Sequence, residues 1–302
     1  MSLLIIGSAA IDSIQSPEGS RERVIGGSGV HAAFAASFFA PVQLVGVVGD
    51  DWPDANTDLL RRKGIDTQGL EFRKGAKTLS WSGKYFDNMD DRETLDIQLN
   101  VMGEEYKPIV PEDYRETEFV FLANGSPISH LDLLSKMKKR PRLVVADTMN
   151  FYIENTHDSL MELLGKIDGL ILNDSEVKLL TGMRNYIAAA RKILTFGPKF
   201  VIVKKGENGA MFLSADAIRL IPAYPTEKVV DPTGAGDSFA GALMGALAAD
   251  GRADAESIMK ALARATIIAS YNVEGFSLER LETLTREEIA NRLDAFRQII
   301  TF

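Results

Sequence analysis

Residues Val229–Leu247, which read VVDPTGAGDSFAGALMGAL, form the most informative stretch of the chain. An extended run ends at Asp231, and Pro232 keeps that residue out of the right-handed helical conformation. A tight glycine-containing turn follows, and the run rich in Ala, Leu and Gly after it predicts a helix. The first peptide N–H groups of a helix have no partner within it, and the helix dipole makes this end positive. The stretch therefore predicts an anion site at a helix N-terminus.

The turn consists of Gly234, Ala235 and Gly236, and Asp237 stands directly after it. A capping role is the alternative explanation for Asp237, since acids are common at helix starts. However, a carboxylate held beside a phosphate repels it unless the carboxylate has a chemical task there. In phosphoryl transfer that task is to accept a proton from the attacking hydroxyl. We therefore interpret Asp237 as a general base and the turn before it as the anion site.

Short apolar runs alternate with amphipathic stretches through most of the chain. Six runs are typical of buried strands, namely Leu3–Gly7, Val42–Val48, Phe119–Ala123, Leu143–Ala146, Gly169–Leu172 and Phe200–Val203. Helical patterns lie between them, at Val30–Phe39, Asp54–Lys63, Leu131–Lys139, Asp158–Gly165, Ser175–Thr181 and Asn185–Thr195. The C-terminal third predicts a hairpin and then three helices, at Asp237–Ala249, Ala255–Tyr271 and Arg286–Ile300. This order predicts an α/β fold with a mostly parallel sheet and helices on both faces.

Two segments, approximately residues 11–25 and 76–103, interrupt the alternation of strands and helices. The first holds a turn-rich stretch between two extended runs. The second has period-two alternation in places, with Leu79, Trp81 and Gly83 on one side. Such alternation is typical of a sheet with one exposed face. Because long excursions from a compact domain are usually functional, we interpret the two segments as one β lid. The alternative is a pair of surface hairpins with no joint role.

The composition excludes several classes of function. The 302 residues include 34 Lys and Arg and 42 Asp and Glu, a formal charge of −8, which argues against a nucleic-acid or anionic-membrane surface. There are no cysteines, which excludes disulfides and Cys-ligated metals, and the three histidines do not cluster. No apolar stretch has the length of a membrane span, and the run Leu3–Ile6 is too short for a signal peptide. We therefore expect a cytoplasmic protein that binds neither nucleic acid nor membranes.

The sequence DPTGAGD resembles the C-terminal signature of the ribokinase-like, or PfkB, carbohydrate kinase family. Other blocks resemble further family motifs in family order, namely Gly26–Gly29, Val45–Asp51, Gly64–Asp66, Asn173–Glu176 (N-x-x-E) and Lys205–Ala210 (G-x-x-G). The resemblance spans nearly the whole chain. It implies a single ribokinase-like domain over residues 1–302, built as a three-layer α/β/α sandwich with a small β-sheet lid. It also implies an ATP- and Mg²⁺-dependent kinase that phosphorylates a hydroxyl of a sugar or sugar-like substrate.

The resemblance further implies a role for each matching residue. Asp237 would be the base, and the amides of Gly234, Ala235 and Gly236 would hold the transferring phosphoryl group. The substrate-binding residues would be Asp12, Gly26, Gly27, Ser28 and His31. The cofactor-binding residues would be Asn173, Glu176, Lys205, Gly206, Gly209, Thr233 and Asn272. Asn173 and Glu176 would organise Mg²⁺ through water, and Asp231 and Thr233 would supply ligands to K⁺ in a potassium-activated member.

Other classes of protein are less consistent with the chain. The pattern Gly27-x-Gly29-x-x-Ala32 before a helix is similar to a dinucleotide fingerprint and would indicate an oxidoreductase. However, the first main strand, Leu3–Gly7, does not lead directly into it. A metabolite sensor on a kinase scaffold would have no need of Asp237 as a base. The chain has no Walker motif, so a P-loop kinase is unsupported. Lys204 could reach a phosphate, but lysines that end a strand are more often solvated, so we leave it out of the site.

Several residues bear on the choice of substrate. His31 stands where the family often has Asn, which weakens an assignment to ribose or fructose; it either contacts the ligand or packs on a helix face. Three lid aromatics either stack on a base or fill the core of the lid, namely Trp81, Tyr85 and Phe86. Three polar residues would face the substrate if their strands present them inward, namely Arg92, Gln98 and Asn100. A nucleoside kinase is therefore the alternative within the family, and an uncovered lid edge would allow a homodimer.

Overall fold

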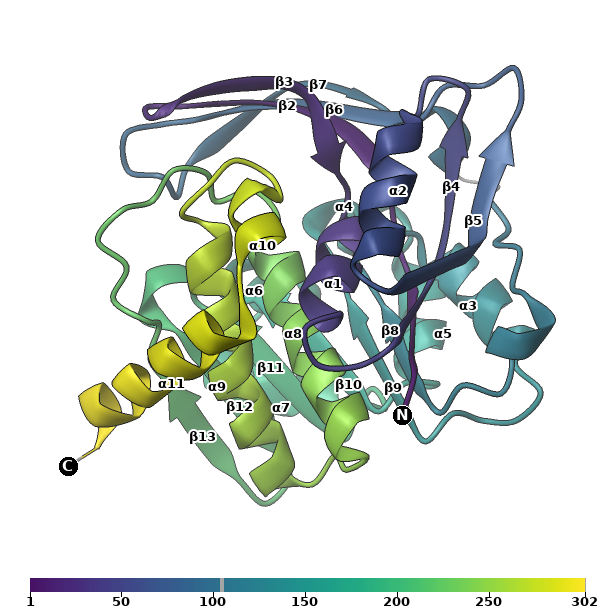
Figure 1. Ribbon diagram of the computed structural model, residues 1–302. Helices are drawn as coiled ribbons and strands as arrows, with labels where there is room; N and C mark the ends of the chain where they lie inside the picture. The colour runs from purple at the N-terminus through teal and green to yellow at the C-terminus, as the bar shows by residue number, and fades with distance from the viewer. Residues whose placement is uncertain (104–105, 302) are drawn as a thin grey trace.

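A nine-stranded sheet lies at the centre of the protein, whose structure is a computed structural model that describes residues 1–103 and 106–301 (Figure 1). Across the sheet, the strands are β13 (Ile218–Ile221), β12 (Ala210–Ser214), β11 (Phe200–Lys204), β10 (Gly169–Asn173), β9 (Leu143–Asp147), β8 (Phe119–Leu122), β1 (Leu3–Ile6), β4 (Val42–Gly49) and β5 (Ile65–Arg73). Neighbouring strands from β5 to β11 run parallel, whereas β12 and β13 pair antiparallel. The carboxyl ends of the parallel strands therefore meet at one edge.

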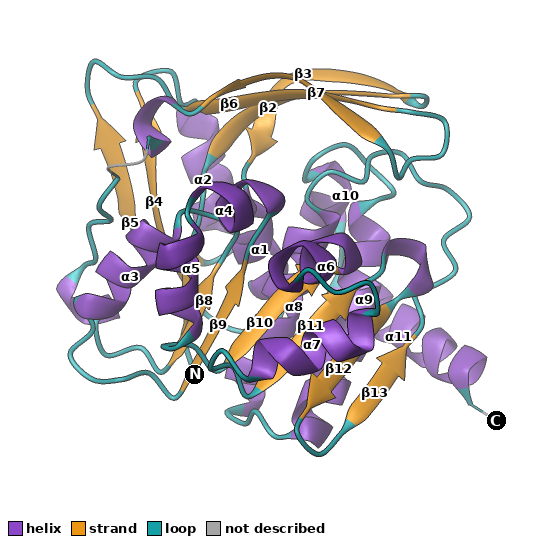
Figure 2. Cartoon of the chain, turned by 180° about the vertical axis from the view of Figure 1, so that it is seen from behind, coloured by secondary structure: helices purple, strands orange, loops and turns teal. Residues whose placement is uncertain are grey.

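Helices cover both faces of the sheet and give three layers (Figures 1 and 2). One face is covered by α1 (Ser28–Ala36), α2 (Asp54–Arg62), α8 (Ala235–Asp250), α9 (Ala255–Asn272), α10 (Glu279–Thr283) and α11 (Arg286–Ile300). The other is covered by α3 (Pro127–Ser135), α4 (Asn150–Asn155), α5 (His157–Leu164), α6 (Asp174–Thr181) and α7 (Tyr186–Leu194). The central strands bury both of their sides: in β1, Leu3 and Ile5 enter one hydrophobic cluster, and Leu4 and Ile6 enter the other. The predicted α/β sandwich is confirmed.

Small residues bring α8 and α1 into close contact. Gly241 and Gly245 of α8 face Ala32 and Ala36 of α1, and a Cβ on Gly245 would stand 2.7 Å from the carbonyl oxygen of Ala36. A larger side chain at either glycine would force the two helices apart. The close approach places the N-terminal ends of both helices together, at the edge where the parallel strands end.

A second, four-stranded sheet lies over this edge (Figure 1). Its strands are, in order, β3 (Gly19–Gly26), β2 (Ala10–Ser16), β6 (Leu79–Tyr85) and β7 (Arg92–Gln98). Strands β2 and β6 pair parallel, and the two outer pairs are antiparallel. The two segments identified in the sequence therefore form one small sheet, as the predicted fold class requires. A cluster formed by Ile14, Tyr85, Val230 and Phe276 joins this sheet to the segments that precede α8 and follow α9.

Some elements differ from the prediction. The helix expected at Leu131–Lys139 lies at Pro127–Ser135, because proline is well suited to the first turn of a helix. Strand β5, Ile65–Arg73, and the short helices α4 and α10 were not predicted; β5 is an edge strand whose polar residues hide its pattern. Within residues 1–103 and 106–301, no helix combines the length and the hydropathy needed to cross a membrane.

Candidate active site

The glycine-containing turn stands at the N-terminus of α8, as predicted. Gly234 has φ 73°, a left-handed conformation that favours glycine, and a Cβ there would also overlap the ring of His31. The turn is closed by a hydrogen bond from the Ala235 amide to the Pro232 carbonyl at 3.1 Å. Gly234 is therefore required by both backbone conformation and space. This turn at a helix N-terminus has the geometry expected of an anion site.

Asp237 lies in the first turn of α8, half-buried beside this site. Burial raises the pKa of its carboxyl group, and the positive charges of Lys204 and Arg92 offset part of the rise. Lys204 comes from the floor of the site, on β11, whereas Arg92 comes from the lid, on β7. The structure therefore brings together the three elements of the predicted chemistry: the acid, the anion turn and the lid.

Lys204 belongs to the site, contrary to the expectation of a solvated side chain. Its Nζ donates to Asp147 Oδ2 at 2.7 Å, and the two side chains are 20% and 2% exposed. Asp147 ends β9, two strands away from Lys204, and its other carboxylate oxygen accepts the Thr148 amide. Lys205, which was predicted to bind the nucleotide, instead directs its ammonium group to the ring of Tyr186, 5.1 Å from the centroid. β11 ends at Lys204, and Lys205 begins the turn that follows, so the two side chains leave the backbone in different directions.

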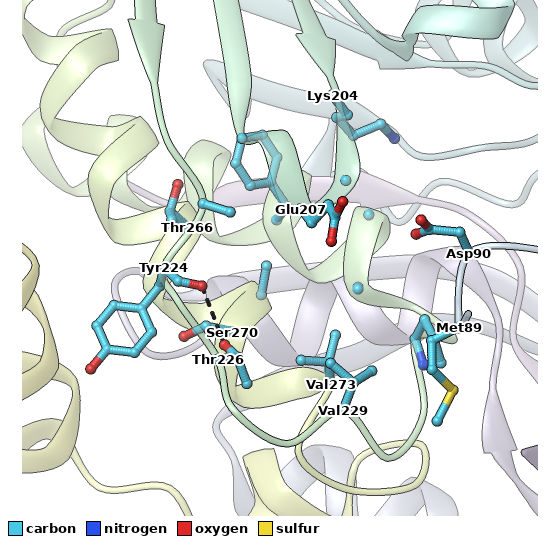
Figure 3. Close-up of a pocket in the computed structure, with 18 of the residues that line it drawn as sticks. Met89, Asp90, Lys204, Glu207, Tyr224, Thr226, Val229, Thr266, Ser270 and Val273 are labelled. Atoms are coloured by element: carbon cyan, nitrogen blue, oxygen red, sulfur yellow. Dashed lines mark hydrogen bonds between the residues drawn. The ribbon is translucent and has the colours of Figure 1, made fainter. Parts of the chain in front are cut away.

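A cavity of about 520 Å³ extends from the anion turn (Figure 3). It is lined by Lys204, Gly206 and Gly209 from the floor, Met89 and Asp90 from the lid, and Phe239 from α8. A triphosphate at the turn would place its nucleoside in this space. The sequence analysis missed a further part of the lining, which comes from the stretch 223–226 and from α9 at Thr266, Ala269 and Ser270. These residues carry no motif, and only the packing of α9 beside β13 reveals them.

Asn272 was predicted to bind the nucleotide, but the structure places it beneath the turn and outside the lining of this cavity. Its Oδ1 accepts from Ser238 Oγ at 2.8 Å, and its Nδ2 donates to the Thr233 carbonyl at 2.9 Å. Asn272 therefore ties the end of α9 to the start of α8. Contrary to the prediction, Asn272 supports the turn and does not line the cavity.

The predicted substrate residues Asp12, Gly26, Gly27 and Ser28 lie together on the lid side of the turn. The Asp12 carboxylate occupies the space that a side chain at Gly26 would fill. Burial and the negative charges of Asp231 and Asp237 raise the pKa of Asp12 to about 7, more than the Gly27 amide and Arg92 lower it. Ser28 is bonded within the protein: its Oγ donates to the Asn124 carbonyl at 2.7 Å and its amide donates to Ser8 Oγ at 2.9 Å.

His31 was predicted to contact the substrate, and the structure instead packs it between α1 and α8. Its ring lies against Gly234 and is 2% exposed. Within the described part of the chain, neither ring nitrogen has a hydrogen-bond partner. Burial lowers the pKa of His31 to about 4, so the ring is neutral at pH 7. The alternative of a packed histidine is therefore the one observed.

Asn173 and Glu176 form a capping box at the start of α6. Asn173 Oδ1 accepts the Glu176 amide at 2.8 Å, and Glu176 Oε2 accepts the Asn173 amide at 2.7 Å. Burial and the Asp147 and Asp237 charges, opposed by Lys204, raise the pKa of Glu176 to about 7. In the part of the chain that is described, no three His, Cys, Asp or Glu side chains are arranged to hold a metal directly. Because the box already occupies Asn173 Oδ1 and Glu176 Oε2, these two residues fit a magnesium ion held through water.

Asp231 and Thr233, which were predicted to bind K⁺, form hydrogen bonds with other residues of the chain. The two carboxylate oxygens of Asp231 accept the amides of Thr233 and Ser277, at 2.8 and 2.9 Å. Thr233 Oγ1 donates to the Tyr85 hydroxyl of the lid at 3.2 Å. These bonds hold the segment before the turn in place and link it to the lid.

The register of the lid strands shows which side chains face the site. Asp12 pairs with Trp81, and Trp81 pairs with Ile97, so the three share the inner face. Arg92 lies on that face opposite Tyr85, whereas Gln98 pairs with Ser80 on the outer face, contrary to one prediction. Two other residues that could have faced the ligands do not do so. Asn100 Nδ2 donates to the Thr78 carbonyl, and the Phe86 side chain is exposed. Tyr85 is buried in the cluster that joins lid and body, so it fills the lid core.

Comparisons with known proteins agree with this geometry. Residues 2–280 match the model of the pfkB family carbohydrate kinases. A cytidine kinase of Thermococcus kodakarensis is 28% identical over 248 residues, 81% of this chain and 87% of the relative. The fold is similar to that of a nucleoside kinase of Methanocaldococcus jannaschii (TM-score 0.77, 20% identity, covering 97% of this chain and 98% of that one). It is also similar to a protein described as ribokinase II from E. coli, in complex with ATP and Mg²⁺ (TM-score 0.79, 21% identity, 99% of both chains). The chain belongs to the pfkB family of carbohydrate kinases.

Proposed function

We propose that the protein transfers the γ-phosphoryl group of ATP to a hydroxyl of a sugar, either free or as part of a nucleoside, with Asp237 as the base. One observation carries the proposal. Asp237 stands in the first turn of α8, between the anion turn with its cavity on one side and Asp12 under the lid on the other. A donor and an acceptor bound on these two sides would meet beside the carboxylate.

The chemistry follows from this placement. Asp237 accepts the proton of the acceptor hydroxyl as its oxygen bonds to the γ-phosphorus, and ADP leaves as the bond to the bridging oxygen breaks. Burial raises the pKa of Asp237, which makes the carboxylate a better proton acceptor. The amides of Gly234, Ala235 and Gly236 offer fixed donors to the transferring group, and the lid excludes water.

The cavity lined by Gly206 and Gly209 is the proposed ATP site. Glu176 and Asn173 would hold Mg²⁺ through water, and the ion would neutralise phosphate charge. Activation by K⁺ at Asp231 and Thr233 stays a hypothesis, which an assay with and without K⁺ tests. We take residues 1–302 as one catalytic unit with a lid at approximately 11–25 and 76–103. The proposal also includes a cytoplasmic location, where ATP is available, and a homodimer through the lid, whose exposed edge strand carries Leu95 and Ile97.

The lid favours a nucleoside over a free sugar as the acceptor. The Trp81 ring lies over Gly83, which has no side chain, and forms a flat surface on the inner face. The Arg92 guanidinium carbon is 5.6 Å from the centroid of this ring. A planar base attached to the sugar would stack on such a surface, whereas a free sugar would leave it in water. The similarity to a cytidine kinase supports the same choice.

The test measures ADP release with ATP and Mg²⁺ on a panel of pyrimidine nucleosides, purine nucleosides and free sugars. We expect release with nucleosides and much less with sugars. Release with sugars alone would restore the sugar kinase as the first choice. Tight binding of a metabolite without any ADP release would contradict the kinase proposal and favour a sensor.

A further inference from the structure

The side chain of Lys204 borders the anion turn as well as the cavity. Its Nζ lies 3.3 Å from the point at which a Cβ on Gly236 would stand. The same nitrogen donates to Asp147 Oδ2 at 2.7 Å, which fixes the ammonium group at this position. Figure 3 shows Lys204 at the end of its strand, on the rim of the cavity. A phosphate group bound at the turn would therefore lie within reach of the ammonium group.

Three carboxylates surround this ammonium group. Asp147, Glu176 and Asp237 raise the pKa of Lys204 by more than burial lowers it, so the lysine is charged at neutral pH. A buried Lys–Asp pair costs much desolvation energy, and apolar side chains of similar volume often stabilise a fold as well. Stability alone therefore gives a weak reason for this pair. A triphosphate bound here, in contrast, is repelled by these three carboxylates, and a cation at this point offsets the repulsion and strengthens its binding.

We propose that Lys204 is a catalytic residue whose ammonium group contacts the β- and γ-phosphate oxygens of ATP, and that Asp147 is the positioning residue that holds it there. This inference rests on the proposed phosphoryl transfer. Lysine suits the role because it is a compact charge with three donors, so it can keep its bond to Asp147 while it donates to phosphate.

In the transfer, the acceptor oxygen bonds to the γ-phosphorus, the bond from that phosphorus to the bridging oxygen breaks, and the acceptor proton goes to Asp237. Negative charge then grows on the oxygen that leaves with ADP. Lys204 stabilises this charge and neither gives nor takes a proton. The anion turn holds the transferring group, while Lys204 acts on the leaving side.

The first experiment replaces the lysine by an uncharged side chain of similar length, Lys204→Met. We expect kcat/KM for ATP to fall about 10²–10³-fold, as on loss of one preorganised donor, with little change in the KM for the acceptor. Lys205→Met is the matched control, because this neighbouring lysine is directed to Tyr186 and should leave both constants unchanged. Lys204→Arg retains the charge and should recover part of the loss.

Inorganic tripolyphosphate gives a readout that does not require turnover. This probe carries the charged part of ATP without base or sugar. Its affinity, measured by calorimetry, should fall about tenfold in Lys204→Met and stay unchanged in Lys205→Met. Equal affinity in the wild type and in Lys204→Met would overturn the proposal.

The double variant Lys204→Met/Asp147→Asn separates catalysis from folding. Lys204→Met alone leaves a buried carboxylate without its cation and should lower the Tm. The double variant removes both charges, so we expect the Tm to recover while turnover and tripolyphosphate affinity stay low. Recovery of wild-type kcat in the double variant would show that Lys204 only neutralises Asp147. The wild type is assayed alongside: if it releases no ADP with any acceptor, the proposed function fails, while tripolyphosphate binding still decides the role of Lys204.

Discussion

The floor of the active site and the lid above it are held together very differently. In the floor, polar groups are buried and bonded to more than one partner: Asp231 accepts two backbone amides, and Asn272 joins α8 to the segment before it. In the lid, strand β7 is exposed along its whole length. The lid is attached to the body through a small cluster that includes Tyr85 and Phe276.

This difference indicates a division of labour. Stabilisation of a transferring phosphoryl group needs donors and charges that do not move during the reaction, and the floor provides them. Recognition of the acceptor needs a surface that can differ between relatives without disturbing the catalytic groups, and the inner face of the lid provides it. Substitutions in the floor should therefore lower kcat, whereas substitutions in the lid should act mainly on the KM for the acceptor.

The largest effect is expected at the base. Asp237→Asn keeps the size of the side chain but removes its ability to accept the acceptor proton. We expect kcat to fall by about 10²–10⁴-fold with little change in ATP affinity, measured by steady-state kinetics and calorimetry. Asp250→Asn, at the opposite end of α8, is the control and should keep full turnover. Wild-type turnover in Asp237→Asn would remove this residue from the mechanism.

A second effect, at the inner face of the lid, depends on pH. Since the folded protein holds Asp12 at a pKa of about 7 against 3.8 for the free group, it retains a proton that the unfolded chain loses between about pH 4 and 7. The folded state binds more protons in this range, so this group lowers the free energy of unfolding as pH rises through it. Asp12→Asn removes this penalty, and its stability relative to the wild type should rise by on the order of 2–4 kcal/mol between pH 4.5 and 8.

Urea denaturation at a series of pH values measures this difference. Asp158→Asn, which changes an exposed acid of α5, is the matched control and should show no such trend. Above pH 7, where Asp12 is mostly ionised, the same variant should bind the acceptor less well, because a charged acceptor of hydroxyl hydrogen bonds is lost. A stability difference that does not change with pH would contradict the burial of an acid at this position.

The sequence predicted those parts of the site that are local in the chain. The acid and the anion turn fall within four consecutive residues, Gly234 to Asp237, so motif and geometry coincide. The sandwich was predictable because its central strands are apolar on both faces. The half-polar edge strand β5 lacked that signal.

Features that depend on tertiary packing were not predictable. Lys204 and Asp147 are brought together by the order of strands in the sheet, with β10 between them. Adjacent lysines look alike in a sequence, and the point at which β11 ends, directly after Lys204, decides that Lys204 and not Lys205 enters the site. His31 was misplaced for the same reason, because its burial depends on the close packing of α1 against α8.

The smallest expected effect lies in the lid and tests the division of labour directly. Trp81→Ala removes a flat apolar surface from the inner face without touching the anion turn or the cavity lining. We expect the KM for a nucleoside acceptor to rise about tenfold, as on loss of one stacking contact, while kcat and the KM for ATP change less than threefold. Phe86→Ala, which removes an exposed aromatic next to the same strand, is the control. If Trp81→Ala instead lowered kcat as strongly as a substitution in the floor, lid and floor would act as one unit and their different construction would have no functional meaning.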